Sequence, residues 1–275
     1  MVSRLWRRRA SITEAPTTAT VAADAEPYFG GVGPNGVLLC HGFTGSPRSM
    51  RPWAEHLEAD GFRVVLPRLP GHGTTWQEMN QTRWEDWYGH VDRAFTDLRA
   101  ECERVFVCGL SMGGGLAVRI AEQHGAAVAG LALVNPSIGS ADPRMHALPV
   151  LRHLVPSLAG VSGDIALPDV LEGGYDRSPL QAAWSMTMMW RDIQRNLDRV
   201  VQPLLIFKSA KDRVVDERSL KLIKARVSSP DLTVVSLERS YHVATLDHDA
   251  ELIFTTSSAF FRRLADEEQQ RVART

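Results

Sequence analysis

Three side chains in this sequence could together perform nucleophilic catalysis: Ser111, Asp212 and His242. Ser111 is the central residue of GLSMG at 109–113, a G-x-S-x-G pattern between a strand-like apolar run and an apolar helical run. In this setting the serine occupies a tight, strained turn, and the two glycines leave room for the strand and the helix on either side. Its hydroxyl then lies beside a helix N-terminus, which favours negative charge. The pattern predicts a nucleophilic serine.

A serine hydroxyl needs a base, and in a strand–turn–helix site of this kind the acid and the base follow the serine along the chain. Asp212 stands in the loop AKDRVV at 210–215, directly after the apolar run PLLIFKS. His242 follows the last apolar run, within SYHVA at 240–244. His248 is the alternative base, but it lies where we expect the last helix to begin. We therefore predict Asp212 as the acid and His242 as the base.

Acyl transfer also requires donors for an oxyanion, each worth about 3 kcal/mol. One donor is expected from the backbone N–H of Met112, the residue after the nucleophile. The second is expected from the loop HGFTG at 41–45, most simply the N–H of Phe43. His41 is a second candidate base, although a histidine that braces the loop is the favoured interpretation.

The sequence carries no pattern for a metal or a cofactor. His72, in GHG at 71–73, has no second histidine or carboxylate pair at ligand spacing, so we expect a structural role. The glycine-rich segment 109–115 lacks the Lys-Ser/Thr ending of a phosphate loop and contains a nucleophile instead. A cofactor-free site is predicted.

Length and composition limit the function classes. The 275 residues, 44% of them hydrophobic, suffice for one large α/β domain. A net charge of −1 argues against nucleic acid as a partner. Three cysteines in no metal-binding spacing indicate reduced core residues of a cytoplasmic protein. No segment has the apolar length of a signal peptide core or a membrane span, and the basic start MVSRLWRRR is expected to be a disordered tail rather than a membrane contact.

Strands and helices are expected to alternate along the chain. Strands are expected at 37–40, 62–66, 105–110, 128–134, 203–208 and 232–237. Helices are expected at about 50–59, 84–100, 112–123, 217–227 and 250–264. This alternation predicts a mostly parallel central sheet with helices on both faces.

One interval breaks the alternation. Between 136 and about 200 no strand signal appears, and five prolines divide the segment into short helices before WSMTMMWRDI at 184–193. Such an insertion is usually a lid or a binding element. We therefore expect a tail at 1–30, a core formed by 31–136 and 200–270, and a small helical cap at 137–199.

With these residues in hand, the sequence resembles the α/β-hydrolase superfamily over residues 35–265, and within it the small bacterial monoacylglycerol lipases and related carboxylesterases. The matching segments are LLCHGFTGSPRSMRPWAE at 38–55, LPRLPGHGT at 66–74, FVCGLSMGG at 106–114 and SYHVATLDHD at 240–249. The family's triad and oxyanion donors fall on the five residues already placed.

The resemblance adds expectations for the cap. In the family this interval covers the active site and presents an apolar surface to a lipid, so transient contact with a membrane or micelle is implied. The segment PDVLE at 168–172 resembles the one whose glutamate binds the glycerol hydroxyls, which assigns that role to Glu172. A pocket-shaping apolar position maps onto Val161.

We accordingly expect a serine esterase that hydrolyses monoacylglycerols to a fatty acid and glycerol through an acyl-enzyme. A carboxylesterase for short-chain or aryl esters would share every catalytic residue, and a substrate panel separates the two. A non-catalytic binding protein on the same fold is the alternative of another class, and a fluorophosphonate probe for activated serines distinguishes it. The pattern specifies no oligomeric state.

Overall fold

A parallel β-sheet forms the centre of the molecule. The computed structural model describes residue 17 and residues 19–160 and 163–274, with side chains as far as residue 270. The sheet consists of β1 (Tyr28–Gly30), β2 (Asn35–Cys40), β3 (Arg63–Leu66), β4 (Arg104–Leu110), β5 (Val128–Val134), β8 (Leu204–Ser209) and β9 (Leu232–Leu237). Their spatial order is β1-β3-β2-β4-β5-β8-β9, and every pairing is parallel except that of β1 with β3.

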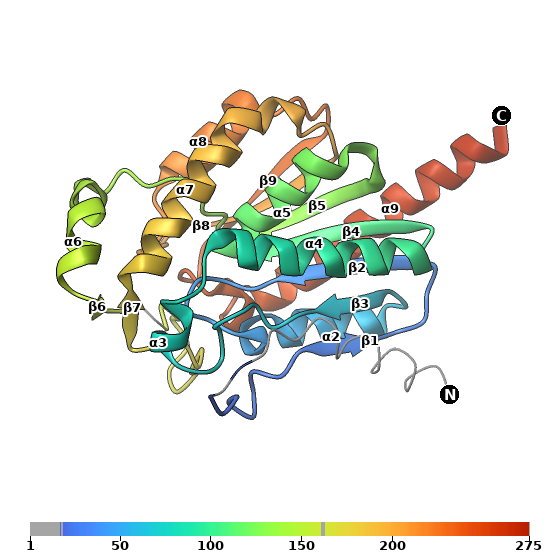
Figure 1. The fold of residues 1–275 in the computed structure, drawn as a ribbon. Coiled ribbons are helices and arrows are strands. Elements are labelled where there is room, and N and C mark those ends of the chain that lie inside the picture. Colours follow the sequence, from blue (N-terminus) through green and yellow to red (C-terminus); the bar gives the residue numbers. More distant parts are fainter. Residues whose placement is uncertain (1–16, 18, 161–162, 275) are drawn as a thin grey trace.

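Helices follow the strands. They are α2 (Arg51–Ala59), α3 (Trp76–Met79), α4 (Trp84–Glu101), α5 (Met112–His124), α8 (Glu217–Arg226) and α9 (Ala250–Arg274). All of them except the single-turn α3 were predicted from the apolar patterns. The expected α/β-hydrolase architecture, a mostly parallel sheet with helices on both faces, is confirmed (Figure 1). The last helix is ten residues longer than predicted, because ADEEQQRVAR at 265–274 has strong helix formers but no apolar periodicity.

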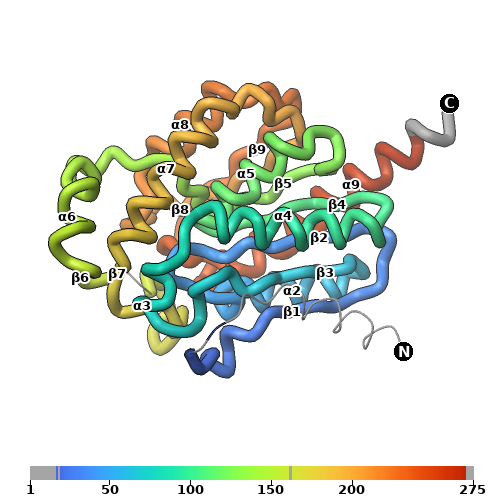
Figure 2. Tube along the Cα trace, viewed as in Figure 1, coloured from blue at the N-terminus to red at the C-terminus, as the bar shows by residue number. Residues whose placement is uncertain are grey.

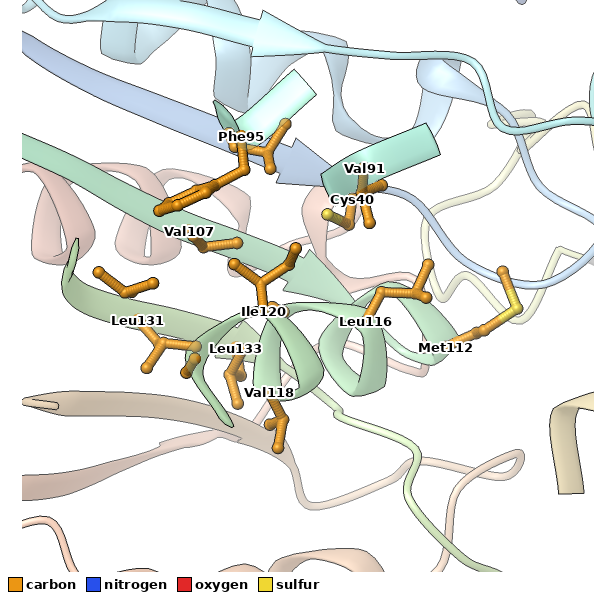
Figure 3. Packing of buried hydrophobic residues seen from close by; sticks show 14 of the residues in the cluster. Cys40, Val91, Phe95, Val107, Met112, Leu116, Val118, Ile120, Leu131 and Leu133 are labelled. Atoms are coloured by element: carbon orange, nitrogen blue, oxygen red, sulfur yellow. The ribbon is translucent and has the colours of Figure 1, made fainter. Parts of the chain in front are cut away.

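Two apolar layers lie on the two faces of the sheet. Leu38 and Cys40 of β2 belong to the layer beneath α4 and α5, whereas Val37 and Leu39 belong to the layer beneath α2 and α9. This alternation follows from the two-residue period of a strand. Figure 3 shows the first layer, in which Leu116 and Ile120 of α5 lie against the side chains of β4 and β5. Because helices pack on both faces of the sheet, its central strands are held in place. The loops that carry Ser111 and Asp212 begin at the ends of two of these strands, β4 and β8.

The insertion at 137–199 lies between β5 and β8. It contains α6 (Leu148–Leu154), β6 (Ser157–Ala159), β7 (Arg177–Pro179), α7 (Leu180–Asn196) and two short 3-10 helices, Pro143–Ala147 and Leu197–Arg199. The antiparallel pair of β6 and β7 was not expected, because three residues per strand are too few to display a two-residue period. The insertion gathers at one end of the sheet, beside α3 (Figures 1 and 2).

The N-terminal segment differs from its prediction as a tail up to residue 30. Tyr28–Gly30 forms the edge strand β1, paired with Leu66, Val65 and Val64 of β3. A strand of three residues is too short to be predicted from its sequence. Strand β1 forms because β3 offers it an unpaired edge in the folded sheet. The basic residues at 4–9 lie outside the described residues. Among the helices that the structure describes, none is long and apolar enough to cross a membrane.

Helices α2 and α9 are joined by one buried polar contact across the second apolar layer. The indole N–H of Trp53 donates to Ser257 Oγ at 2.8 Å, and that hydroxyl donates to the Phe254 carbonyl at 3.0 Å. Both side chains are fully buried. A buried donor that loses its acceptor is costly, because water cannot replace the acceptor.

Replacing Ser257 with alanine is therefore expected to lower the free energy of unfolding by about 1–3 kcal/mol. Urea denaturation followed by tryptophan fluorescence measures it. Thr255→Ala, on the exposed side of the same helix, is the matched control and should change stability by less than about 0.5 kcal/mol. Equal stability of the two variants would show that the Trp53 contact contributes nothing.

Candidate active site

Ser111 occupies the turn between β4 and α5. Its backbone angles are φ 55° and ψ −118°, and the hydroxyl-bearing residue is 8% exposed. A side chain at Gly113 would overlap the Cys40 carbonyl oxygen, and one at Gly109 would overlap the Gly113 carbonyl oxygen. A strand, a turn and a helix can approach this closely only without Cβ atoms at these two positions. Strain of this kind is concentrated at functional sites.

The loop after β2 lies directly against the serine. A Cβ atom added at Gly42 would stand 3.5 Å from Ser111 Cβ. Phe43, the next residue, places its ring edge-to-face on Trp87 at 6.0 Å, which fixes the loop from the side of α4. Met112 is fully buried in the first turn of α5. The structure thus brings the segments that carry both predicted oxyanion donors, Phe43 and Met112, to Ser111.

His41 braces this loop. Its Nε2 accepts the Leu69 N–H at 3.1 Å, so Nδ1 carries the proton and donates to the Gly42 carbonyl at 3.0 Å. Burial, and then the neighbouring His72, lower the pKa of His41 well below its ordinary value. A neutral ring with both nitrogens engaged is not available as a base.

His72 is also held neutral. It is fully buried, and burial lowers its pKa to about 4. Its Nδ1 lies 3.0 Å from the Pro70 carbonyl. Within the described ranges, no group of three or more histidine, cysteine, aspartate or glutamate side chains is placed to hold a metal ion.

Asp212 and His242, the predicted acid and base, contact each other. His242 Nδ1 lies 3.0 Å from Asp212 Oδ1, and both side chains are almost completely buried. An ionised carboxylate can only accept, so Nδ1 carries the proton and Nε2 keeps the lone pair that a base needs. Among the described residues, no hydrogen bond joins Ser111 Oγ to this ring.

The Asp212 carboxylate is stabilised in its ionised form. Burial by itself would raise its pKa, but the hydrogen bond and charge of His242, the Lys208 ammonium group and the Val215 N–H together hold that pKa well below the usual range. The N–H groups of Val214 and Val215 both donate to Oδ1 at 2.9 Å. The negative charge is thus available to orient and stabilise an imidazolium.

His248 lies apart from this pair. It is exposed near the start of α9, and its Nδ1 contacts Arg239 Nη2 at 3.2 Å. Of the two candidate bases, the structure brings only His242 to Asp212.

Sequence reasoning missed Asn135, which connects the loops of the site. Asn135 follows β5, with φ 45°, and its Nδ2 donates to the His242 carbonyl at 2.8 Å and to Ser209 Oγ at 2.9 Å. Its Oδ1 accepts the Ser209 N–H at 2.8 Å. The preceding Val134 carbonyl accepts the Ser111 N–H at 3.0 Å. The end of β5 therefore connects the turn that carries Ser111 to the loop that carries His242. The signal in the sequence that could have identified Asn135 was a single amide side chain at the end of a buried strand.

Lys208 was missed as well. Its Nζ donates to Asp212 Oδ2 at 2.8 Å and to the Val215 carbonyl at 2.7 Å. The available signal was a lysine inside the apolar run PLLIFKS.

Two aspartates fasten the insertion to the histidine loop. Asp164 Oδ2 accepts the His242 N–H at 3.1 Å, and its Oδ1 forms an ion pair with Arg213 Nε at 3.2 Å. Asp247 accepts the N–H groups of Ala166 at 2.7 Å and Leu167 at 3.1 Å. Residues 164–167 of the insertion are thus hydrogen-bonded to the loop that carries His242.

Glu172 lies at the inner side of the insertion, 9% exposed. Its Oε2 accepts the Gly163 N–H at 2.9 Å, and a Cβ atom at Gly45 would stand 3.0 Å from its Oε1. Burial raises the pKa of Glu172, while the Gly163 N–H and His242 act in the opposite direction. The carboxylate therefore borders the loop at 41–45, which carries the predicted oxyanion donor Phe43, and interacts electrostatically with His242. Val161 lies outside the described residues.

Known proteins are similar to this chain over most of its length. Residues 35–249 match the family described as "Serine aminopeptidase, S33". A thermostable monoacylglycerol lipase from Bacillus sp. (strain H-257) is 39% identical over 250 residues, covering 89% of this chain and 97% of that protein. A carboxylesterase from Bacillus subtilis (strain 168) is 24% identical over 242 residues, covering 87% and 97%.

Solved structures are similar too. One, reported in work on LipS and LipT, two metagenome-derived lipolytic enzymes, has a TM-score of 0.86 and 38% identity, covering 89% of this chain and all of that one. The monoacylglycerol lipase from Paleococcus ferrophilus has a TM-score of 0.73 at 20% identity, covering 87% and 99%, and this likeness concerns the fold alone.

Only one of the two candidate bases contacts a carboxylate that can orient it. His242→Ala is therefore expected to slow labelling by a fluorophosphonate probe by about 10⁴-fold or more, because Ser111 loses its proton acceptor. The second-order labelling rate is the measurement. His248→Ala is the matched control and should label within about threefold of the original rate. A reversed result would make His248 the base.

Proposed function

We propose that this chain, which belongs to the α/β-hydrolase family described as "Serine aminopeptidase, S33", is a serine esterase that hydrolyses monoacylglycerols to a fatty acid and glycerol. The observation that carries the substrate class is the 39% identity to a monoacylglycerol lipase along 97% of that relative. The Asp212–His242 pair at 3.0 Å, beside the strained Ser111 turn, supports the reaction type.

The reaction proceeds through an acyl-enzyme. His242 Nε2 takes the proton from Ser111 Oγ as the oxygen attacks the ester carbonyl, and Asp212 stabilises the resulting imidazolium. The N–H groups of Phe43 and Met112 receive the oxyanion. The imidazolium then protonates the leaving glycerol oxygen, and a water molecule repeats the cycle to release the fatty acid and restore the serine.

The insertion serves as a cap over this site. Its helix α7 packs on α5, since a Cβ atom at Gly115 would stand 3.3 Å from Met189 Cε and 3.5 Å from Ile193 Cδ1. Met189 and Trp190 lie in the core layer, so much of the segment 184–190 is packing material. The segment that faces the site is the one around Asp164 and Glu172.

A lipid-facing role of the cap is part of the proposal. Val150, Leu154 and Leu158 are 66%, 72% and 46% exposed, on α6 and the adjacent β6. Exposed apolar side chains gathered on one protruding element suit transient contact with a micelle or membrane surface. We also place the protein in the cytoplasm, in keeping with its three buried free cysteines.

Glu172 accepts hydrogen bonds from the free glycerol hydroxyls in this proposal. Its carboxylate borders the oxyanion loop at Gly45 and is held by the Gly163 N–H, so it is positioned rather than mobile. A buried acceptor near the leaving group favours an alcohol that still carries hydroxyl groups.

Substitution of the nucleophile tests the reaction. Ser111→Ala should lower kcat for monoacylglycerol by about 10⁶-fold and abolish fluorophosphonate labelling, since the triad acts as a unit. The measurements are fatty-acid release and labelling followed by peptide mass spectrometry. Ser236→Ala, an exposed serine on the edge strand β9, is the control and should keep full activity. Retention of more than about a thousandth of the activity in Ser111→Ala would exclude Ser111 as the nucleophile.

Substrate preference tests the role of Glu172. Glu172→Ala should lower kcat/KM for monoacylglycerol by about 10–150-fold, the equivalent of one hydrogen bond to a charged group. An aryl ester lacks the glycerol hydroxyls, so its kcat/KM should stay within about threefold.

Asp169→Asn supplies the matched control for Glu172. It removes an exposed charge from the same segment, and asparagine tolerates the φ of 63° at this position. Both substrates should be unaffected by it. Equal losses on the two substrates in Glu172→Ala would mean that the carboxylate only supports the cap, and a preference for aryl esters in the unaltered protein would favour the carboxylesterase.

A further inference from the structure

We propose that Lys208 is a positioning residue for the acid–base pair: its ammonium group holds the Asp212 carboxylate against His242 and offsets part of the negative charge of that carboxylate. This inference rests on the proposed function, because it concerns how the same triad is tuned. Lys208 touches neither the ester nor the serine, and it acts through Asp212.

Lys208 is hydrogen-bonded to two positions of the loop that follows β8. It is the penultimate residue of β8, and its side chain is 9% exposed between the buried Phe207 and Ser209. Its Nζ donates to Asp212 Oδ2 and to the Val215 carbonyl at 2.8 and 2.7 Å. Both acceptors belong to the loop that follows the same strand. One ammonium group therefore closes the loop around the acid.

The two oxygens of Asp212 are held by different donors. Oδ1 accepts from His242 Nδ1 and from the N–H groups of Val214 and Val215. Among the described residues, Oδ2 accepts only from Lys208. Rotation of the carboxylate would break the bonds on both sides at once. Removal of the Lys208 bond leaves Oδ2 buried without a donor and frees the carboxylate to turn away from His242.

The positive charge of Lys208 also acts on the Asp212 carboxylate. A buried carboxylate next to a histidine favours the imidazolium, which cannot act as a base. Lys208 offsets part of that negative charge through its contact with Asp212 Oδ2, on the other carboxylate oxygen from the one that His242 contacts. The hydrogen bond from Lys208 is one of the causes that hold the pKa of Asp212 below its usual range.

The other charged groups facing His242 come from the insertion and the Asp212 loop. Glu172 interacts electrostatically with His242, and Asp164 accepts its backbone N–H. Arg213 is ion-paired with Asp164, and its guanidinium lies 3.7 Å from the centroid of the Tyr241 ring. Arg213 thus partly offsets Asp164 at the mouth of the site. Lys208 is the cation that contacts Asp212 directly.

If the Lys208–Asp212 ion pair had a purely structural role, a different result would be expected. A buried salt bridge whose only role is packing would change the stability when broken, by an amount that depends on its desolvation. It would not move the pH dependence of the reaction. The pH profile of kcat/KM therefore separates the two roles.

The experiment compares Lys208→Met and Lys208→Arg with the unaltered protein, using kcat/KM for a soluble ester between about pH 5 and pH 9. Because removal of a nearby buried positive charge favours the imidazolium, Lys208→Met should raise the pH midpoint by about one unit. Its plateau should fall about tenfold as the carboxylate loses a donor. Lys208→Arg keeps the charge and should hold the midpoint within about 0.3 units.

Lys211→Met is the matched control. It removes the same charge from an exposed position next to Asp212, where water screens it, and should move the midpoint by less than about 0.2 units. Lys208→Gln, a second neutral variant, should show the same upward shift as Lys208→Met and replaces it if that chain does not fold.

Two results would overturn the inference: an unmoved midpoint in the folded neutral variants, or an equal rise in Lys208→Arg. Fluorophosphonate labelling keeps this distinct from the proposed function. If Ser111 of the unaltered protein is not labelled and no ester is hydrolysed, the proposed function fails. If Ser111 is labelled and the midpoint stays in place in Lys208→Met, only the role of Lys208 fails.

Discussion

A carboxylate that is almost cut off from water, yet must remain ionised, is the constraint on which the candidate site depends. The side chain of Asp212 is 1% exposed, and its charge is tolerable only because donors surround it. These donors are two backbone N–H groups of its own loop, the His242 ring and the Lys208 ammonium group. The need to satisfy one buried charge thus fixes the loop after β8 and the orientation of the ring that follows β9.

The same principle attaches the insertion to the core. Asp164 and Asp247 are directed at backbone N–H groups across the boundary between the insertion and the histidine loop. Glu172 accepts a backbone N–H within the insertion while it borders the oxyanion loop. Because Asp164 and Asp247 would each lose buried hydrogen bonds if the two parts separated, residues 164–167 of the insertion are held against the histidine loop.

The serine side depends on sterics instead of charge. Gly113 allows the first turn of α5 to touch the carbonyl of Cys40, which brings the loop after β2 against Ser111. Asn135 then links this side to the other, since its side chain holds the His242 loop and the Ser209 backbone. Close backbone approach positions the proposed nucleophile, and buried polar groups position the proposed acid and base.

The sequence by itself determined the features that depend on neighbouring residues. The GLSMG turn, the six predicted strands and the order of Ser111, Asp212 and His242 follow from local sterics, apolar composition and strand ends. The sequence also favoured His242 over His248, but the contact of His242 with Asp212, 30 positions away along the chain, is made by loop packing in the tertiary structure. Lys208 and Asn135 also needed the folded chain: a polar side chain in an apolar run acquires a role only when its partner, from another strand end, lies within hydrogen-bond distance.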